Sequence, residues 1–88
     1  MAVYRIELRP SAVRELAALP QDVQRRLARV IDRLEMNPRP SGAKALAGPD
    51  RLLRVRVGDY RIVYQAHDAA RLVDVIRVAH RSAVYRGL

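Results

Sequence analysis

The sequence feature that most constrains the fold is a Gly-Asp pair set between two alternating segments. Residues 52–57 and 60–66 both alternate apolar and polar side chains, as strands with one buried face do. Only Gly58 and Asp59 separate them, and a two-residue connection with glycine first is typical of a type II′ hairpin turn. The pattern therefore predicts an antiparallel hairpin whose pairing register is fixed by its turn.

This register predicts which side chains share a face of the hairpin. It sets Arg56 opposite Arg61 and Arg54 opposite Val63. One face is then apolar and is expected to meet the helices; it carries Leu53, Val55, Val57, Tyr60, Ile62 and Tyr64. The other face carries the three arginines. Like charges directly opposite destabilise a sheet by on the order of 0.2 to 1 kcal/mol per pair, so an anion, and not folding, explains Arg56 opposite Arg61.

The alternative is that a carboxylate within the chain neutralises these arginines. It would come from the last strand or the tail, and Asp74 is the nearest candidate in sequence. Under this alternative the three arginines serve the fold and mark no ligand site.

The remaining pattern completes an α+β fold. In chain order it predicts a strand at 3–8, a helix from Ser11 as its N-cap to Leu19, a second helix opened by Pro20 and stopped at Asn37-Pro38, a loop at 38–50 and a last strand at about 72–79. The expected order is βααβββ, an antiparallel sheet with a helical hairpin packed on one face. Residues 1–88 are expected to form a single domain.

The charge balance indicates a polyanionic partner. The chain has 17 Lys and Arg against 9 Asp and Glu, a net charge of +8, and each half carries +4. All but one of the basic residues are Arg, which fits bidentate phosphate recognition and equally fits a GC-rich genome.

Composition also excludes several classes of protein. There is no Cys and there are only two His, so we expect no metal site and no cofactor. No apolar run is long enough for a membrane span or a signal peptide, which favours a cytoplasmic protein with no membrane partner.

The end of the chain holds further candidates for a site. If the last strand runs antiparallel to the one before it, then His80, Arg81 and Tyr85 lie beyond its end, beside the turn at Gly58. There they could reach the same anion as Arg56.

Two segments together resemble a known family. Leu53 to Tyr64 (LRVRVGDYRIVY) and Val78 to Tyr85 (VAHRSAVY) are similar to the RelE/ParE toxins of type II toxin–antitoxin systems. The resemblance implies a toxin neutralised by a cognate antitoxin, in a hetero-oligomer that binds its own operator DNA through the antitoxin. RelE-type members cleave mRNA in the ribosomal A site, whereas ParE-type members inhibit DNA gyrase.

The resemblance also implies roles for particular residues. Those that match the family's basic and aromatic positions are Arg54, Arg56, Arg61, Arg81 and Tyr85, and His80 adds a group that some relatives use in acid/base work. Arg77 on the last strand joins Arg54, Arg56, Arg61 and Arg81 as a candidate for binding RNA phosphates. No residue matches the Glu that some members use.

The chemistry of RNA cleavage without metal fits these residue types. The 2′-hydroxyl attacks the adjacent phosphate, which needs a base, an acid at the leaving oxygen and cations around the phosphorane. Arginines supply the cations, and Tyr85, then His80, are the candidates for proton transfer. Alternatively, Tyr85 is an aromatic anchor for the tail and His80 an ordinary histidine. A third class of function is a non-catalytic basic module that docks on RNA or on an acidic protein.

Overall fold

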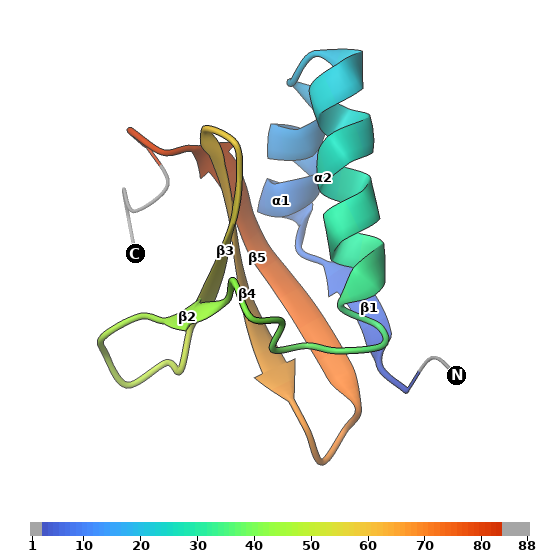
Figure 1. The fold of residues 1–88 in the computed structure, drawn as a ribbon, viewed down its shortest axis with the longest axis vertical. Coiled ribbons are helices and arrows are strands. Elements are labelled where there is room, and N and C mark those ends of the chain that lie inside the picture. Colours follow the sequence, from blue (N-terminus) through green and yellow to red (C-terminus); the bar gives the residue numbers. More distant parts are fainter. Residues whose placement is uncertain (1–2, 84–88) are drawn as a thin grey trace.

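Two helices lie on one face of a five-stranded sheet in the computed structural model, which describes residues 3–83 (Figure 1). The elements are β1 (Arg5–Leu8), α1 (Pro10–Ala17), α2 (Gln21–Arg33), β2 (Lys44–Ala45), β3 (Leu53–Val57), β4 (Tyr60–His67) and β5 (Leu72–His80). The sheet order is β1-β5-β4-β3-β2. The predicted α+β class, with a helical pair on one face, is confirmed.

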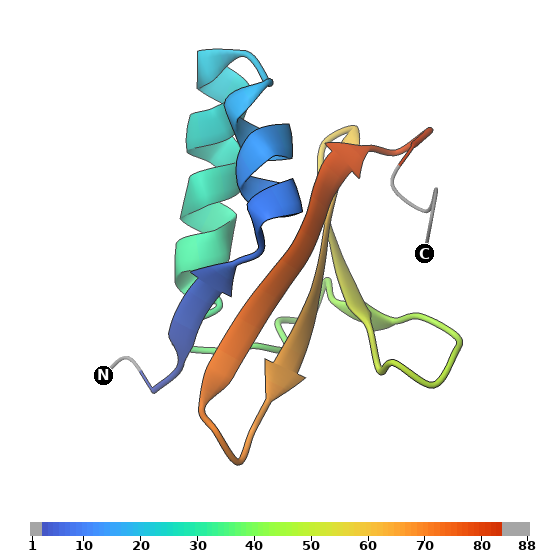
Figure 2. The same cartoon turned by 180° about the vertical axis from the view of Figure 1, so that it is seen from behind.

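The sheet is mixed, whereas the sequence predicted an antiparallel one. β1 pairs with β5 in parallel, from Arg5 opposite Leu72 to Leu8 opposite Val75, and Figure 2 shows the two strands side by side. Turn residues report only on strands joined by a hairpin. β1 reaches β5 after two helices and three other strands have intervened, so no local pattern marks its direction.

The predicted loop at 38–50 contains a short strand. Lys44 and Ala45 pair with Arg54 and Leu53, which makes β2 the outer edge of the sheet. Two residues inside a segment rich in Pro and Gly are too few to show a period of two, so this strand was missed.

Both helices begin at a proline, of which only Pro20 was predicted to open a helix. Pro10 opens α1, with Arg9 as the N-cap where Ser11 was expected; the Ser11 Oγ instead donates to the Ile76 carbonyl at 3.1 Å. Pro20 is the N-cap of α2 where it was expected to be the first helical residue. A proline favours these positions because it has no N–H to satisfy in the first turn.

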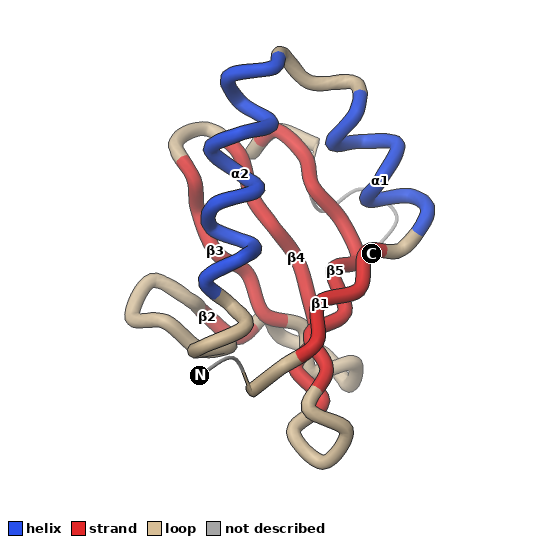
Figure 3. Tube along the Cα trace, turned by 90° about the vertical axis from the view of Figure 1, so that its right-hand side faces the viewer, coloured by secondary structure: helices blue, strands red, loops and turns tan. Residues whose placement is uncertain are grey.

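The core lies between the helices and the sheet (Figure 3). Its buried members are Ala12, Leu27, Ile31, Leu34, Val55, Ile62, Tyr64, Val73, Val75 and Val78, with Leu53, Val57 and Tyr60 packed against them. The apolar face predicted for the hairpin is therefore the face that meets the helices.

A β-bulge explains why β5 could not be oriented from its sequence. The register with β4 shifts at Val63/Tyr64: Tyr64 lies opposite Val75, but Val63 lies opposite Arg77. Buried residues therefore fall at odd positions before the bulge and at Val78 after it. The alternation of buried and exposed side chains shifts by one residue at the bulge, so the sequence of β5 shows apolar and polar residues on both faces.

Candidate active site on the open face of the sheet

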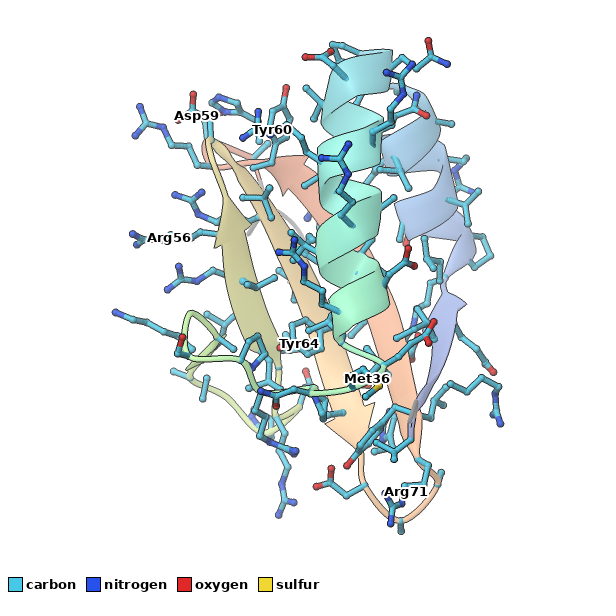
Figure 4. The ribbon with its side chains drawn as sticks, turned by 45° about the vertical axis from the view of Figure 1, so that its right-hand side comes forward. Met36, Arg56, Asp59, Tyr60, Tyr64 and Arg71 are labelled. Carbon is cyan, nitrogen blue, oxygen red and sulfur yellow. The ribbon has the colours of Figure 1, made fainter. Side chains whose placement is uncertain are left out.

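The β3–β4 hairpin places Arg54, Arg56 and Arg61, called here the arginine face, on the side of the sheet away from the helices. The register is the predicted one, with Arg56 directly opposite Arg61 and Arg54 opposite Val63. Figure 4 shows Arg56 pointing away from α2, while Tyr64 lies on the side that faces it. The three arginine side chains thus share one face of the sheet, on which Arg54 is buried.

The turn depends on Gly58 in two ways. Its φ is +60°, and the turn's second residue is not among the described residues with positive φ, which is the type II′ pattern. A Cβ on Gly58 would lie 2.8 Å from the Nη2 of Arg26, whose guanidinium therefore covers the turn from α2. No sequence signal links Arg26 to the turn.

No carboxylate pairs with the arginine face among residues 3–83. The ion pairs there are Arg5–Glu7, Arg9–Asp74, Arg39–Asp68 and Arg77–Glu15. The Asp74 alternative is wrong, because the Asp74 Oδ2 lies 3.0 Å from the Arg9 Nη2. Within residues 3–83, therefore, no carboxylate offsets the positive charge of the arginine face.

The three arginines differ in what they contact. The Arg61 Nη1 donates to the carbonyls of Gly58 and Tyr60, both at 3.0 Å, and these bonds hold the guanidinium beside the turn. Arg56 is exposed. Arg54 is only 7% exposed, and its buried Nε has no hydrogen-bond partner among the described residues. A buried donor without a partner costs about 1 to 3 kcal/mol, so Arg54 is poorly placed for stability alone.

His80 and Arg81 lie at the turn end of the hairpin, as predicted for an antiparallel β5. His80 is opposite Tyr60, their rings meeting edge to face at 5.7 Å, and the Arg81 N–H donates to the Asp59 carbonyl at 2.8 Å. Because Tyr60 belongs to the helix-facing side, its partner His80 does not share the arginine face.

The His80 ring has a defined hydrogen-bonding state when neutral. Its Nδ1 accepts the Ser82 backbone N–H at 3.2 Å and lies 2.9 Å from the Ser82 Oγ. A backbone N–H can only donate, so Nδ1 is unprotonated and the neutral ring carries its proton on Nε2. In this state Nε2 is a hydrogen-bond donor and not a base.

Arg77 lies opposite Val63, on the face of the sheet that carries Arg54 and Arg61, but unlike them it has a carboxylate partner. The Arg77 Nε donates to the Glu15 Oε2 at 3.2 Å, and the Glu15 Oε1 accepts the Val78 N–H at 2.9 Å, so Arg77 is tied to α1. Tyr85 lies outside the described residues. Lys44 was not predicted as a site residue, yet β2 sets it directly opposite Arg54.

The far end of β4 is built differently. The Arg39 guanidinium binds both Asp68 oxygens at 2.9 and 3.0 Å, and the Tyr4 hydroxyl donates to Asp68 at 2.7 Å; these three residues are called the clamp. The hydrogen bonds from Arg39 and then Tyr4 lower the pKa of Asp68, and the same bond to Asp68 raises the pKa of Tyr4.

A cleft of about 810 Å³ lies beside the clamp. Its charged lining residues are Arg39, Arg51, Asp50 and Asp68, so positive and negative groups balance, and His67 also lines it. Tyr64 nearby donates its hydroxyl to the Pro38 carbonyl at 2.7 Å, and burial raises its pKa to about 12. Because this cleft carries no net charge, a polyanion is attracted more strongly to the arginine face.

Residues 3–83 contain neither a metal-binding cluster nor a helix that could span a membrane. They contain no group of three or more His, Asp or Glu side chains placed to hold a metal ion. Neither of their helices is long and apolar enough to cross a membrane.

The comparisons with known proteins agree with the fold. The family model described as the ParE toxin of the type II toxin–antitoxin system parDE matches residues 6–85. A protein named Toxin RelE from Mycobacterium tuberculosis is 33% identical over 84 residues, which cover 94% of this chain and 87% of that protein.

Solved structures are similar as well. The RelE–RelB complex of the archaeon Pyrococcus horikoshii has a TM-score of 0.81 at 28% identity and covers 93% of this chain and 99% of that one. The intact RelBE toxin–antitoxin complex of Escherichia coli has a TM-score of 0.73 at 28% identity, covering 88% and 95%.

Matches of this extent define a small toxin of a type II toxin–antitoxin system. The chain belongs to the RelE/ParE superfamily as a RelE-type toxin. The family resemblance stated from its sequence is thereby confirmed.

Proposed function

We propose that this toxin is a ribosome-dependent endoribonuclease that cleaves mRNA in the A site without a metal ion. The observation that carries the proposal is the arginine face, three guanidinium groups on one surface with no carboxylate partner among the described residues. Their mutual repulsion disfavours folding and favours binding a phosphodiester.

The reaction needs charge stabilisation above all. The RNA 2′-oxygen attacks the adjacent phosphorus, the bond to the 5′-oxygen breaks, and the products are a 2′,3′-cyclic phosphate and a 5′-hydroxyl. Negative charge grows on the phosphoryl oxygens in the transition state, and guanidinium groups fixed beforehand stabilise it without reorganisation. Arg61 is the best fixed, because its Nη1 is held by two carbonyls at the turn.

Proton transfer requires a second kind of group. One proton leaves the 2′-hydroxyl and another reaches the 5′-oxygen. The family match favours Tyr85 for this work, for which cations close to its hydroxyl would be needed to lower its pKa. His80 is the second candidate, as an imidazolium that gives its Nε2 proton to the leaving oxygen; it ranks below Tyr85 because its ring lies on the Tyr60 side of the sheet and not on the arginine face.

The proposed partner is a cognate antitoxin. Its acidic or amphipathic segments would cover the arginine face and offset the repulsion between Arg56 and Arg61. The similar structures from Pyrococcus horikoshii and Escherichia coli are complexes with such partners. We further propose that the complex binds its operator DNA through the antitoxin, and that the toxin acts in the cytoplasm, where translating ribosomes lie.

The test is cleavage of a defined mRNA on programmed ribosomes by purified toxin. The expected result is a cut in the A-site codon, at a rate that Arg61→Ala and Tyr85→Phe lower far more than they change the free energy of unfolding. His80→Ala measures the contribution of the second candidate.

The second candidate function is inhibition of DNA gyrase, which the match to the ParE family model favours. A block of gyrase supercoiling with no cleavage on ribosomes would support it and overturn the nuclease proposal. Salt-sensitive RNA binding with neither activity would instead indicate a non-catalytic basic module.

A further inference from the structure

We propose that Lys44 forms, together with Arg54, a second phosphate-binding subsite that holds the RNA phosphate next to the one being cleaved. This inference rests on the proposed function, because it assigns a place to the flanking part of the same RNA strand. Lys44 is the only lysine of the chain.

The position of Lys44 comes from the pairing of β2 with β3. Lys44 lies directly opposite Arg54, and residues directly opposite each other in an antiparallel pair point to the same face, with Cβ atoms about 5 Å apart. Lys44 therefore extends the arginine face outward by one strand.

Lys44 is held there by its surroundings along the chain. Its neighbour Ala45 pairs with Leu53, and the Leu46 N–H donates to the Leu52 carbonyl at 2.9 Å. On the other side, the Ala43 N–H donates to the Pro40 carbonyl at 2.9 Å. Hydrogen bonds on both sides fix the backbone of Lys44, so its side chain starts from a fixed position on the sheet.

The charges around Lys44 favour a ligand. Lys44 is exposed and takes part in no ion pair of residues 3–83, and its opposite residue Arg54 carries the buried Nε without a partner. Lys44 opposite Arg54 is thus a second like-charge pair, beside Arg56 opposite Arg61. Each of these two cross-strand pairs is expected to lower the stability of the fold, and a bound polyanionic strand would offset the repulsion in both.

The spacing of the two rows fits an extended strand of RNA. Arg54 and Arg56 are two residues apart on one strand, so the rows lie about 7 Å apart. Successive phosphates of an extended single strand are separated by a comparable distance. With the scissile phosphate at Arg56 and Arg61, the neighbouring phosphate falls at Lys44 and Arg54.

The test measures binding of a short single-stranded RNA with 2′-O-methyl riboses, which cannot be cleaved. Wild type, Lys44→Ala and Lys44→Arg are compared by fluorescence anisotropy over a range of salt concentrations. Arg33→Ala is the matched control, because it removes the same charge from an exposed position on α2. Lys44→Ala is expected to weaken binding about 3- to 10-fold and to lower the salt slope by about 0.7, with Lys44→Arg close to wild type.

A scan of neutral methylphosphonate linkages locates the phosphate. A neutral linkage next to the scissile position should weaken binding to wild type. The same linkage should not change the affinity of Lys44→Ala, which already lacks the cation for that phosphate. On programmed ribosomes, Lys44→Ala should raise the toxin concentration for half-maximal cleavage and leave the saturated rate near that of wild type. A merely structural role would not produce this linkage-specific result.

The outcomes separate this subsite from the proposed function. Suppose that wild type cleaves mRNA on ribosomes. The subsite is then overturned, and the nuclease proposal stands, if Lys44→Ala binds the RNA as tightly as wild type. The same holds if no linkage distinguishes the affinity of Lys44→Ala from that of Arg33→Ala. A linkage-specific loss without cleavage on ribosomes would support the subsite and overturn the nuclease. Absence of RNA binding by wild type would overturn the subsite.

Discussion

The arginines at the two ends of strand β4 differ in their partners. Beyond its last residue, Arg39 is bound through both nitrogens to Asp68, which also receives the Tyr4 hydroxyl. Near its first residue, Arg61 faces Arg56, and its hydrogen-bond partners among the described residues are two backbone carbonyls. The chain has 9 acidic side chains for 17 basic ones, and the part that the structure describes has a carboxylate at the clamp and none paired with the arginine face.

The difference teaches how to separate charges that serve the fold from charges that serve a ligand. The clamp joins the N-terminal segment, the loop after α2 and the β4–β5 turn, so its ion pair ties distant parts of the chain together. Among residues 3–83 the arginine face has no ion pair to a distant segment, and like charges directly opposite each other are expected to lower stability. Substitutions at the clamp should therefore affect folding, and substitutions at the arginine face should affect activity.

The largest expected effect is on cleavage by Arg54→Met. Methionine is apolar and retains most of the length of the arginine side chain, but it lacks the charge and the unpartnered Nε. We expect this change to lower cleavage on ribosomes by about 100-fold. The free energy of unfolding in urea should be unchanged or higher, because a buried charge is replaced by an apolar group. Arg39→Met is the matched control, and it should lower stability while cleavage stays within a few-fold. A reversed pattern would break the comparison.

A smaller effect is expected for Tyr64→Phe. This change removes the hydroxyl that donates to the Pro38 carbonyl and leaves a buried acceptor without its partner, which should cost about 1 to 2 kcal/mol of stability. Urea unfolding measures the loss, and ultraviolet titration of wild type should show one tyrosine ionising near pH 12 that is missing in the variant. Cleavage should be unaffected, because the side chain faces the helices.

What sequence alone could predict follows the same division. The register of β3 and β4, and with it the arginine face, was predictable because a two-residue turn allows one register. Lys44 was not predictable, because its place depends on a two-residue strand in an irregular segment. Arg77 lies opposite Val63 and so on the face of the sheet that carries Arg54 and Arg61, but its ion pair with Glu15 was not predictable, because the two residues are 62 positions apart in the chain.

The clamp could not be predicted for a related reason. Its members come from three segments far apart in the sequence, and only the parallel pairing of β1 with β5 brings Tyr4 near Asp68. The faces of a hairpin follow from local pattern, whereas contacts between non-adjacent elements follow from topology.

The pH dependence of stability should arise at the clamp. The pKa of Asp68 is lowered on folding, so its contribution is fully present above its ordinary value near 4 and is lost as the pH falls through the folded-state value. Asp68→Asn should be less stable than wild type at pH 7, and the difference should shrink towards pH 3. Unfolding in urea at several pH values checks this, and a difference that stays constant would show that folding does not lower the pKa of Asp68.

The smallest effect is also the most direct test of the central claim, that the arginine face opposes folding and exists for a ligand. The measurement is a double-mutant cycle of urea unfolding with wild type, Arg56→Thr, Arg61→Thr and the double variant. The account predicts an unfavourable coupling between the two arginines of about 0.2 to 1 kcal/mol that decreases with added salt. It also predicts that Arg56→Thr is at least as stable as wild type while it cleaves mRNA more slowly. A favourable coupling, or a loss of stability in Arg56→Thr with full cleavage, would contradict it.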